Sequence, residues 1–568
     1  MKRLALALSL VAIAACQKTE TAPPASSATS TKAAAASGLD IAADTPQRLA
    51  QLPRTTIDYD RSLLNANEQQ VVAKLIEAAK AFDEIYYRQV SEDNQKMRDE
   101  LAANAGKSAL NQAGYDYFVV NKGPWDRLKG DEPFIGHKKK PAGAAFYPED
   151  MTKDEFEKYV TAHPDQKEAL QGLFTVIRRD GANLKAIPYS QEYKQQLDVA
   201  TKAIRDAAAL TTDNSLKTYL TKLADALGKD NYRDSDMAWM DLNGDLEVIL
   251  GPYEVYEDNL FNYKASFESF LNVVDKNESA KLVVYAQHLP DMEKNLPEPE
   301  QYKNTTRGTS SPIKVVQELY TAGDARRGVQ TSAFNLPNDE YVREKKGSKK
   351  VLLKNVMEAK FKQSGAPVAQ RVLDPALTSK VSFDAYFSHT LFHELSHGLG
   401  PGYLKQANGE RIEVRIPLKN LYSAIEECKA DVLGLWNIRY AIEKKWLTSF
   451  DEQQLYVTYA GLMFRSMRFG VGEAHGRGTA VQWNWIREKG GVTPDANGKY
   501  TIDVAKFRDA VQSLATELLT IEATGDFNRA NTLLTNYGKS TPEMEKVIGG
   551  LKDIPVDITP VYPAAGEK

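Results

Sequence analysis

The chain has 568 residues, which is more than one hydrophobic core normally organises, so we expect at least two lobes. Its composition, 42% hydrophobic and 26% charged residues, is that of an ordinary globular protein. The formal net charge is −4, and acidic and basic residues are interspersed without a basic stripe. This charge pattern argues against nucleic acid as a partner.

The first residues have the organisation of an export signal. Lys2 and Arg3 precede an apolar run, residues 4–15, which is too short to span a bilayer as a mature helix. The run ends in Ile-Ala-Ala-Cys and resembles the lipobox of bacterial lipoproteins, in which the cysteine, here Cys16, is lipidated. We therefore expect a signal peptide over residues 1–15. The alternative is a plain secretory signal with small residues before the cleavage point.

Residues 16–40 are expected to be a lipidated cysteine followed by a flexible tether, because Ala, Ser, Thr and Pro dominate and offer little apolar bulk. Gln17 follows the cysteine, and by resemblance to enteric lipoproteins this favours the outer membrane, with the folded part in the periplasm. The second cysteine, Cys428, is left without a partner for a disulfide. The oligomeric state is not determined by the sequence.

The folded body begins with helical patterning and passes through a β-prone section into a longer helical part. Apolar spacing of three and four residues marks the helical segments, and Gly-Pro punctuation marks the breaks. In chain order we expect helices in 67–103, an ordered loop over 121–151, helices in 154–209, strands at 246–250 and 253–256, helices in 382–473 interrupted by a loop at 398–411, and a helix over 506–521.

These elements predict a mainly α fold with a smaller β component, arranged as two lobes with a cleft. We expect a mixed α/β lobe over 41–290, an inter-lobe segment with a substrate-binding element over 291–380, and a mainly helical lobe over 381–568 that holds a zinc site.

The string His393-Glu394-Leu395-Ser396-His397 carries the most chemical information in the sequence. Two histidines four residues apart lie on one face of a helix, so both imidazoles can bind one zinc ion. Glu394 can then reach a water molecule in the open coordination position and act as its general base. The alternative is a helix with two unrelated histidines. His389, one turn earlier, could instead complete a three-histidine site, although we prefer a position at its rim.

A third protein ligand is expected from Glu426-Glu427-Cys428-Lys429-Ala430-Asp431, on a second helical stretch. Glu427 has an acid four residues later, Asp431, which can accept the free N–H of a liganding imidazole. Glu426 has Ala430 at that position, so we choose Glu427 as the ligand and expect Glu426 outside the ligand set.

The histidine helix together with Glu-Glu-Cys-Lys-Ala-Asp resembles the dipeptidyl peptidase III family of zinc exopeptidases. The resemblance extends to Gly-Pro-Tyr-Glu-Val-Tyr at 251–256, Asn-Leu-Pro-Asn at 335–338 and Ala-His-Gly-Arg at 474–477. It implies one zinc ion held by His393, His397 and Glu427.

The same resemblance implies roles for five further residues. Glu254, Asn335 and Asn338 would bind the N-terminal part of a peptide substrate. Tyr256 and His475 would contact the scissile carbonyl and the transition state. On the residues alone, strand decoration, a structural turn and a packed histidine are the competing interpretations of these positions.

The chain also departs from the family pattern. The family's histidine motif usually has one more residue, whereas this chain has the five-residue form, and the family's C-terminal Arg-Lys pair has no clear counterpart here. The expected function is release of dipeptides from the N-terminus of short peptides. The alternatives are an oligopeptidase or endopeptidase of another HExxH group, and a lipoprotein that binds peptides without turnover. No phosphate-binding loop, dinucleotide fingerprint or Nudix box is present.

Overall fold

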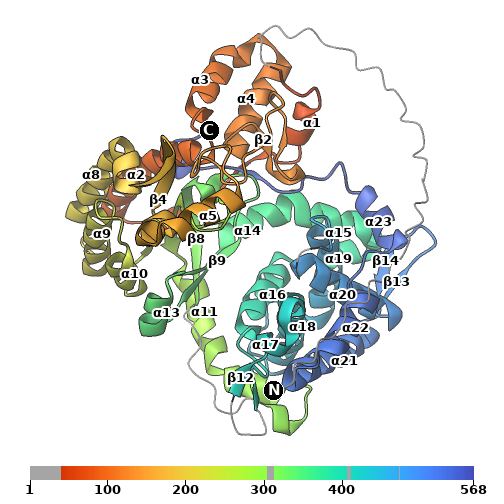
Figure 1. The fold of residues 1–568 in the computed structure, drawn as a ribbon. Coiled ribbons are helices and arrows are strands. Elements are labelled where there is room, and N and C mark those ends of the chain that lie inside the picture. Colours follow the sequence, from red (N-terminus) through yellow and green to blue (C-terminus); the bar gives the residue numbers. More distant parts are fainter. Residues whose placement is uncertain (1–39, 304–312, 406–410, 473) are drawn as a thin grey trace, which may run out of the picture.

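The computed structural model describes residues 40–303, 313–405, 411–472 and 474–568, and Figure 1 shows two lobes with a five-stranded sheet between them. Helices dominate and the sheet component is smaller, so the predicted fold class is confirmed. The predicted signal peptide, Cys16 and nearly all of the tether lie outside the described residues. Among the described residues, no helix combines the length and apolar character that crossing a bilayer requires.

The helices fall into two groups along the chain. The first group belongs to the mixed lobe and comprises α1 (Thr45–Leu49), α2 (Ala66–Val90), α3 (Asn94–Asn104), α4 (Ala109–Asn121), α5 (Lys153–Ala162), α6 (Lys167–Gln171), α7 (Tyr189–Glu192), α8 (Lys194–Leu210), α9 (Asn214–Ala226) and α10 (Arg233–Met240). The second group comprises α11 (Lys276–Gln287), α12 (Leu289–Lys294), α13 (Glu340–Lys346), α14 (Lys354–Lys360), α15 (Ala366–Val372), α16 (Phe383–Ser396), α17 (Arg415–Leu418), α18 (Tyr422–Glu443), α19 (Glu452–Met467), α20 (Ala474–Glu488), α21 (Val504–Thr524), α22 (Phe527–Tyr537) and α23 (Pro542–Gly549).

The largest sheet has the strand order β6-β7-β8-β10-β9. Its strands are β6 (Leu246–Glu254), β7 (Ser266–Val274), β8 (Ile313–Gly323), β9 (Ala333–Leu336) and β10 (Lys349–Leu353). The remaining strands form two-stranded pairs: β1 (Arg54–Thr56) with β15 (Thr559–Val561), β2 (Trp125–Asp126) with β3 (Glu132–Pro133), β4 (Thr175–Asp180) with β5 (Asn183–Pro188), β11 (Tyr403–Lys405) with β12 (Arg411–Glu413), and β13 (Val492–Pro494) with β14 (Tyr500–Ile502). Segment 291–380 therefore supplies three of the five strands of the main sheet.

The main sheet separates the two hydrophobic cores. On β8, Val316 packs into the core of the mixed lobe and Val315 into the core of the helical lobe. On β10, Val351 packs into the core of the mixed lobe and Leu352 into the core of the helical lobe. Successive side chains of a strand point to opposite faces, so a doubly buried strand reads as a continuous apolar run. The sheet is thus a shared wall between the lobes.

Two expectations about local structure were wrong. The segment 154–209 is not helical throughout, because β4 and β5 form a hairpin at its centre around Asp180 and Gly181, which has φ +60°. Its two-residue turn, Gly181-Ala182, has glycine at the first position, which is a hairpin signal that the helical spacing of the flanks concealed. Gly251-Pro252 does not break the β-prone section, since β6 continues to Glu254 through a register shift. Strand β6 lies at the edge of the sheet, where a residue without an N–H is tolerated.

Candidate metal centre and substrate cavity

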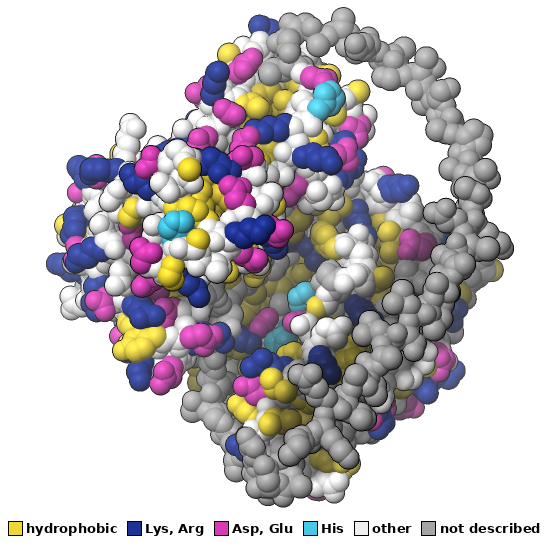
Figure 2. Space-filling model, viewed as in Figure 1, with side chains coloured by type: hydrophobic (Ala, Val, Ile, Leu, Met, Phe, Trp, Pro, Cys, Tyr) yellow, Lys and Arg dark blue, Asp and Glu magenta, His cyan; other side chains and the backbone are white. Residues whose placement is uncertain are grey.

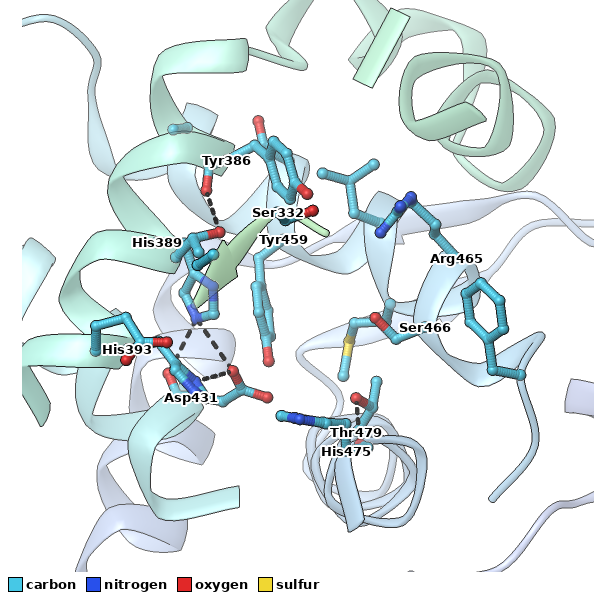
Figure 3. Close-up of a pocket in the computed structure, with 18 of the residues that line it drawn as sticks. Ser332, Tyr386, His389, His393, Asp431, Tyr459, Arg465, Ser466, His475 and Thr479 are labelled. Atoms are coloured by element: carbon cyan, nitrogen blue, oxygen red, sulfur yellow. Dashed lines mark hydrogen bonds and ion pairs between the residues drawn. The ribbon is translucent and has the colours of Figure 1, made fainter. Parts of the chain in front are cut away.

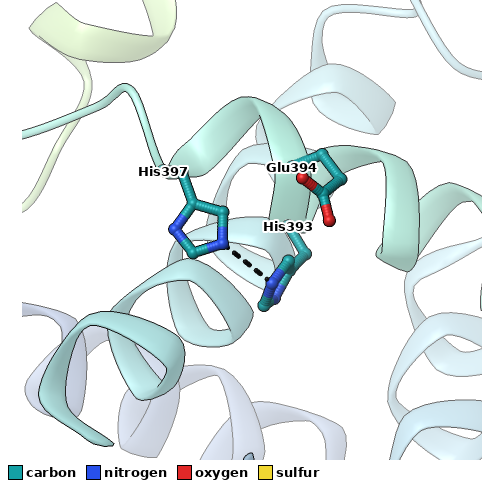
Figure 4. A group of neighbouring side chains, drawn as sticks. All are labelled: His393, Glu394 and His397. Atoms are coloured by element: carbon teal, nitrogen blue, oxygen red, sulfur yellow. Dashed lines mark hydrogen bonds between the residues drawn. The ribbon is translucent and has the colours of Figure 1, made fainter. Parts of the chain in front are cut away.

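Helix α16 brings two imidazoles into direct opposition. Ser382 caps its N-terminus by accepting from the N–H of Ala385, and the helix runs without a bulge to its C-cap, His397. The Nε2 atoms of His393 and His397 are 3.1 Å apart. Figure 4 shows the two rings turned toward one another from successive turns, with Glu394 beside His393.

The opposite ring nitrogens are both held by carboxylates from α18. His393 Nδ1 lies 2.7 Å from Asp431 Oδ1, and His397 Nδ1 lies 2.7 Å from Glu426 Oε1. A carboxylate can only accept, so each Nδ1 carries the proton and each Nε2 presents a lone pair. Two lone pairs that face each other at this distance need a cation between them.

Glu427 completes a set of three donor atoms. Its Oε2 is 3.3 Å from His393 Nε2 and 3.8 Å from His397 Nε2. This oxygen is buried, and the polar groups that contact it are imidazole nitrogens, including His475 Nδ1 at 3.2 Å. Ligands about 2.0–2.1 Å from a tetrahedral zinc ion lie about 3.3 Å from each other, so the three atoms fit one face of such a site.

Glu394 also lies near the histidine pair, since one ligand atom from each of the three residues fits within 4.8 Å of the others. Its Oε2, however, accepts a 2.8 Å hydrogen bond from Lys350 Nζ. Although burial favours the neutral acid, Lys350 and the two imidazoles lower the pKa of Glu394, so the group is ionised at neutral pH. Glu394 is held by a lysine, whereas Glu427 Oε2 faces the imidazole nitrogens, so Glu427 is favoured as the ligand.

The charge around the pair is also suited to a divalent ion. The carboxylates of Glu394, Glu426, Glu427 and Asp431 surround the histidine pair. Lys350 pairs with Glu394 and Lys429 with Glu426, which leaves two negative charges when the imidazoles are neutral. Burial opposes ionisation of Asp431, yet the hydrogen bond of this carboxylate with His393 lowers the pKa of Asp431 to about 2. Burial likewise opposes a charged His393, yet Asp431 and Glu427 raise its pKa to about 10. The site therefore strongly favours a cation at this point.

The predicted substrate residues meet at the same place. One cavity of about 610 Å³ is lined by all nine residues that were expected to bind the metal, carry out the reaction or bind substrate. They are Glu254, Tyr256, Asn335, Asn338, His393, Glu394, His397, Glu427 and His475. Figure 2 shows histidine side chains inside the hollow between the two lobes. His475, at the start of α20, places Nδ1 3.2 Å from Glu427 Oε2.

The part of this cavity formed by the main sheet is acidic and amide-rich. Asn338 Nδ2 donates to Tyr253 O at 3.3 Å and to Glu254 Oε1 at 3.4 Å. Burial raises the pKa of Glu254, and the charge of Glu254 in turn raises the pKa of Tyr256, which is 65% exposed and free to meet a ligand. These groups can accept from a bound ammonium and donate to a bound carbonyl.

The sequence interpretation missed two further acids in this cavity. Glu268, on β7, is 3% exposed and its Oε1 has no hydrogen-bond partner. Burial, with Glu254 and Asp324 nearby, raises its pKa well above the usual range. Asp324 accepts from the hydroxyl of Tyr86 at 2.8 Å. The one available signal for Glu268 was a single acid within the otherwise uncharged strand Ser-Phe-Glu-Ser-Phe.

A second cavity, of about 710 Å³, lies on the other side of His393 and is shown in Figure 3. Its lining is mainly apolar and aromatic, with Tyr386, Tyr459 and Phe469 among its residues. Arg465 reaches into it from α19, and its Nε is buried without a hydrogen-bond partner. The two cavities meet at the metal centre, where they share His393, Glu394 and His475.

His389 also lines this second cavity, and its position argues against a three-histidine site. Its Nε2 lies 3.1 Å from the backbone oxygen of Asp431. That oxygen can only accept, so Nε2 carries a proton and is unavailable to a metal. Burial lowers the pKa of this ring. His389 therefore supports α18 behind the metal centre.

Comparison with known proteins assigns the family. The model of peptidase family M49 matches residues 151–413. The solved structure of DPP III from Caldithrix abyssi is 48% identical, covers 91% of this chain and 98% of its own, and superposes with a TM-score of 0.87. The dipeptidyl-peptidase III structure from Corallococcus sp. strain EGB is 40% identical, with coverages of 92% and 97% and a TM-score of 0.75.

Among curated proteins, Nudix hydrolase 3 of Arabidopsis thaliana is 37% identical over 91% of this chain and 74% of its own length. Dipeptidyl peptidase 3 of Nematostella vectensis is 25% identical over 36% of this chain and 31% of its own length. The match to the DPP III structures extends over nearly the whole of each protein. The chain belongs to peptidase family M49, the dipeptidyl peptidase III family of metallopeptidases.

Proposed function

We propose that this protein is a zinc-dependent exopeptidase that releases dipeptides from the N-terminus of short peptides. The observation that carries the proposal is the shared cavity, in which a three-atom metal site lies beside groups that suit a peptide's N-terminus. Two imidazoles and one carboxylate are the ligand set of many catalytic zinc sites, which keep one position open. One ion is sufficient for this set.

The mechanism follows from the positions of the side chains. A bound zinc ion would supply Lewis acidity, which activates water and polarises the peptide carbonyl. Glu394 takes the proton from the attacking water and returns it to the leaving amine. Tyr256 and His475, at the border of the same cavity, donate hydrogen bonds to the oxyanion that develops on the substrate. Asp431 and Glu426 keep the histidine tautomers that leave both Nε2 atoms free for the metal.

The cavity also explains why cleavage would occur two residues from an end. Glu254 and the amide oxygens of Asn335 and Asn338 can accept from an α-ammonium. Glu254 lies on β6, Asn335 on β9 and Asn338 in the loop after β9, where Asn338 contacts Glu254. A free ammonium bound at a constant distance from the metal determines which peptide bond reaches the attacking water.

The proposal predicts stepwise loss of residue pairs. When defined peptides of five to ten residues are digested and analysed by mass spectrometry, we expect successive losses of two residues from the N-terminus. N-terminal acetylation removes the positive charge and should therefore slow cleavage strongly. Internal cuts in acetylated peptides would identify an endopeptidase, and binding without any product would identify a peptide-binding protein.

The same digest tests the ammonium site. For Glu254→Gln we expect kcat/KM on free peptides to fall about 10- to 100-fold, because hydrogen bonds to charged groups contribute about 1.5–3 kcal/mol. Acetylated peptides should be affected much less. Glu340→Gln, an exposed change on α13, is the matched control. An equal loss on both peptide types would exclude ammonium recognition by Glu254.

We also propose that the protein is exported and anchored to a bacterial membrane, preferably the outer membrane, by lipid on Cys16. The support is the sequence alone: a basic start, a short apolar run and the string Ile-Ala-Ala-Cys before an Ala/Ser/Thr/Pro-rich stretch. Two signals usually stabilise anchoring, and a bacterial lipoprotein carries more than one acyl chain.

Anchoring can be tested in a bacterial host by detergent phase partition. The full chain should enter the detergent phase and incorporate labelled palmitate, while Cys16→Ser should do neither. Peptidase activity should survive in Cys16→Ser, since the cavity lies within residues 254–475. Wild-type protein found only in the aqueous phase would contradict the lipid anchor and leave a plain secretory signal.

A further inference from the structure

Lys350 contacts the residue that the proposed mechanism uses as its general base. Its Nζ donates to Glu394 Oε2 at 2.8 Å and to the backbone oxygen of Glu394 at 3.1 Å. Both side chains are largely shielded, at 16% and 22% exposure. Lysine has three donor directions, and two of them are directed at this one residue.

The backbone contact is available because α16 ends at this point. Gly398 N–H donates to Leu395 O, so it does not continue the helical pattern to Glu394 O. Carbonyls in the last turn of a helix lack partners within the helix and carry its negative end, where a lysine is favourable. Lys350 therefore binds the end of α16 as well as the carboxylate.

The register of β10 directs this lysine to the helical lobe. The preceding residue, Lys349, points to the opposite face and lies 3.2 Å from Glu247 in the mixed lobe. Lys350 is paired with Asn335 across the β9–β10 ladder, so the two side chains share one face. The hairpin that carries a proposed substrate-binding amide thus also carries the lysine.

We propose that Lys350 is a positioning residue for the general base, holding one oxygen of Glu394 so that its other oxygen is directed at the attacking water. This inference rests on the proposed function of Glu394. A glutamate side chain has several rotamers, and a fixed donor removes the alternatives before the substrate arrives. Because Lys350 belongs to the sheet and Glu394 to α16, the contact also aligns the base with the strand that binds the peptide.

The test compares Lys350→Met with Lys350→Arg under steady-state conditions. We expect Lys350→Met to lower kcat on the order of 10–100-fold, as for partners that orient catalytic ligands, with KM and metal content close to those of wild type. Lys350→Arg should recover most of kcat, because a guanidinium can donate to the same carboxylate. Lys354→Met, four residues after Lys350, is the matched control, because it removes a comparable 2.8 Å ion pair with Glu278.

A purely structural role is separated by chemical rescue. Lys350→Ala should regain activity when ethylamine, propylamine or butylamine is added, with saturation, whereas Lys354→Ala should not respond. The inference would be overturned if the kcat of Lys350→Met were within about twofold of wild type or above it. It would also be overturned if Lys350→Met lost the metal, or if activity were restored neither in Lys350→Arg nor by added amine in Lys350→Ala. Glu394→Gln is measured in parallel. If Glu394→Gln stays active, the proposed base is wrong. If Glu394→Gln is inactive and Lys350→Met is fully active, only the role of Lys350 is overturned.

Discussion

Glu394→Gln should retain the metal and lose nearly all turnover. The amide cannot accept the proton of the attacking water, and general acid–base catalysis contributes about 10²–10⁴-fold, so we expect kcat to fall by at least about 100-fold. The measurement is kcat with a dipeptidyl-arylamide, alongside metal analysis of the same sample. Because Glu394 is paired with Lys350 and is not needed for the three-atom metal site, metal content should stay near one ion per chain.

The matched control for this variant is Asp384→Asn, which makes the same chemical change in the first turn of the same helix and in an exposed position. It should be fully active. If Glu394→Gln kept more than a few per cent of wild-type kcat, another group would have to serve as the base. If it lost the metal, Glu394 would be a ligand and the third ligand would have to be reassigned.

Glu427→Gln should lose the metal itself. Its Oε2 is the buried carboxylate oxygen that faces both imidazoles, and an amide oxygen is a much weaker ligand than a carboxylate. Changes in groups that only orient a ligand cost about 10–100-fold in metal affinity, so we expect loss of the ligand to cost at least about 100-fold. Metal affinity can be measured by competition with a chromophoric chelator, and activity should return at high zinc concentration.

Glu443→Gln, at the other end of α18, is the corresponding control, because it removes only an exposed ion pair with Arg439. Wild-type metal affinity in Glu427→Gln would remove Glu427 from the ligand set. The result also bears on His475, whose Nδ1 lies 3.2 Å from the same oxygen. Retention of metal with loss of kcat would show that the Glu427–His475 contact matters for the reaction more than for the metal.

The arrangement of charge in the two cavities suggests how a peptide lies across the metal. Apart from residues of the metal centre, the charged lining of the cavity at the sheet is Glu254, Glu268, Asp324 and Arg327, and that of the cavity at α19 is Arg465. An N-terminal ammonium bound by Glu254, as proposed, would place the rest of the peptide past His393 toward α19. The acetylation experiment tests the first half of this description directly.

Local spacing was enough to predict the chemistry of the metal centre. His393 and His397 are one helical turn apart, and Glu427 and Asp431 repeat that spacing on α18, so each pair is placed by its own helix. The absence of the extra residue found in the family's usual motif did not prevent opposition of the rings, since α16 is regular up to its C-cap. Their convergence, by contrast, depends on the packing of α16 against α18.

Groups that depend on strand register or on long-range contact were not predictable. Lys349 and Lys350 are indistinguishable in the sequence, yet the pleat of β10 directs one to Glu247 and the other to Glu394. Glu268 becomes part of the cavity only because β7 lies beside β6. Segment 291–380, expected to link the lobes, supplies three strands to the main sheet.

Short-range spacing predicted the two liganding histidines and the base, because these three residues lie within one turn of α16, where backbone geometry is the same in every protein. Which acids, amides and lysines surround them depends on the packing of segments that are distant in the chain. Those neighbours come from β6, β7, β9 and β10, up to about 140 residues away in the chain from the histidine pair, and strand pairing rather than local periodicity brings them to the metal.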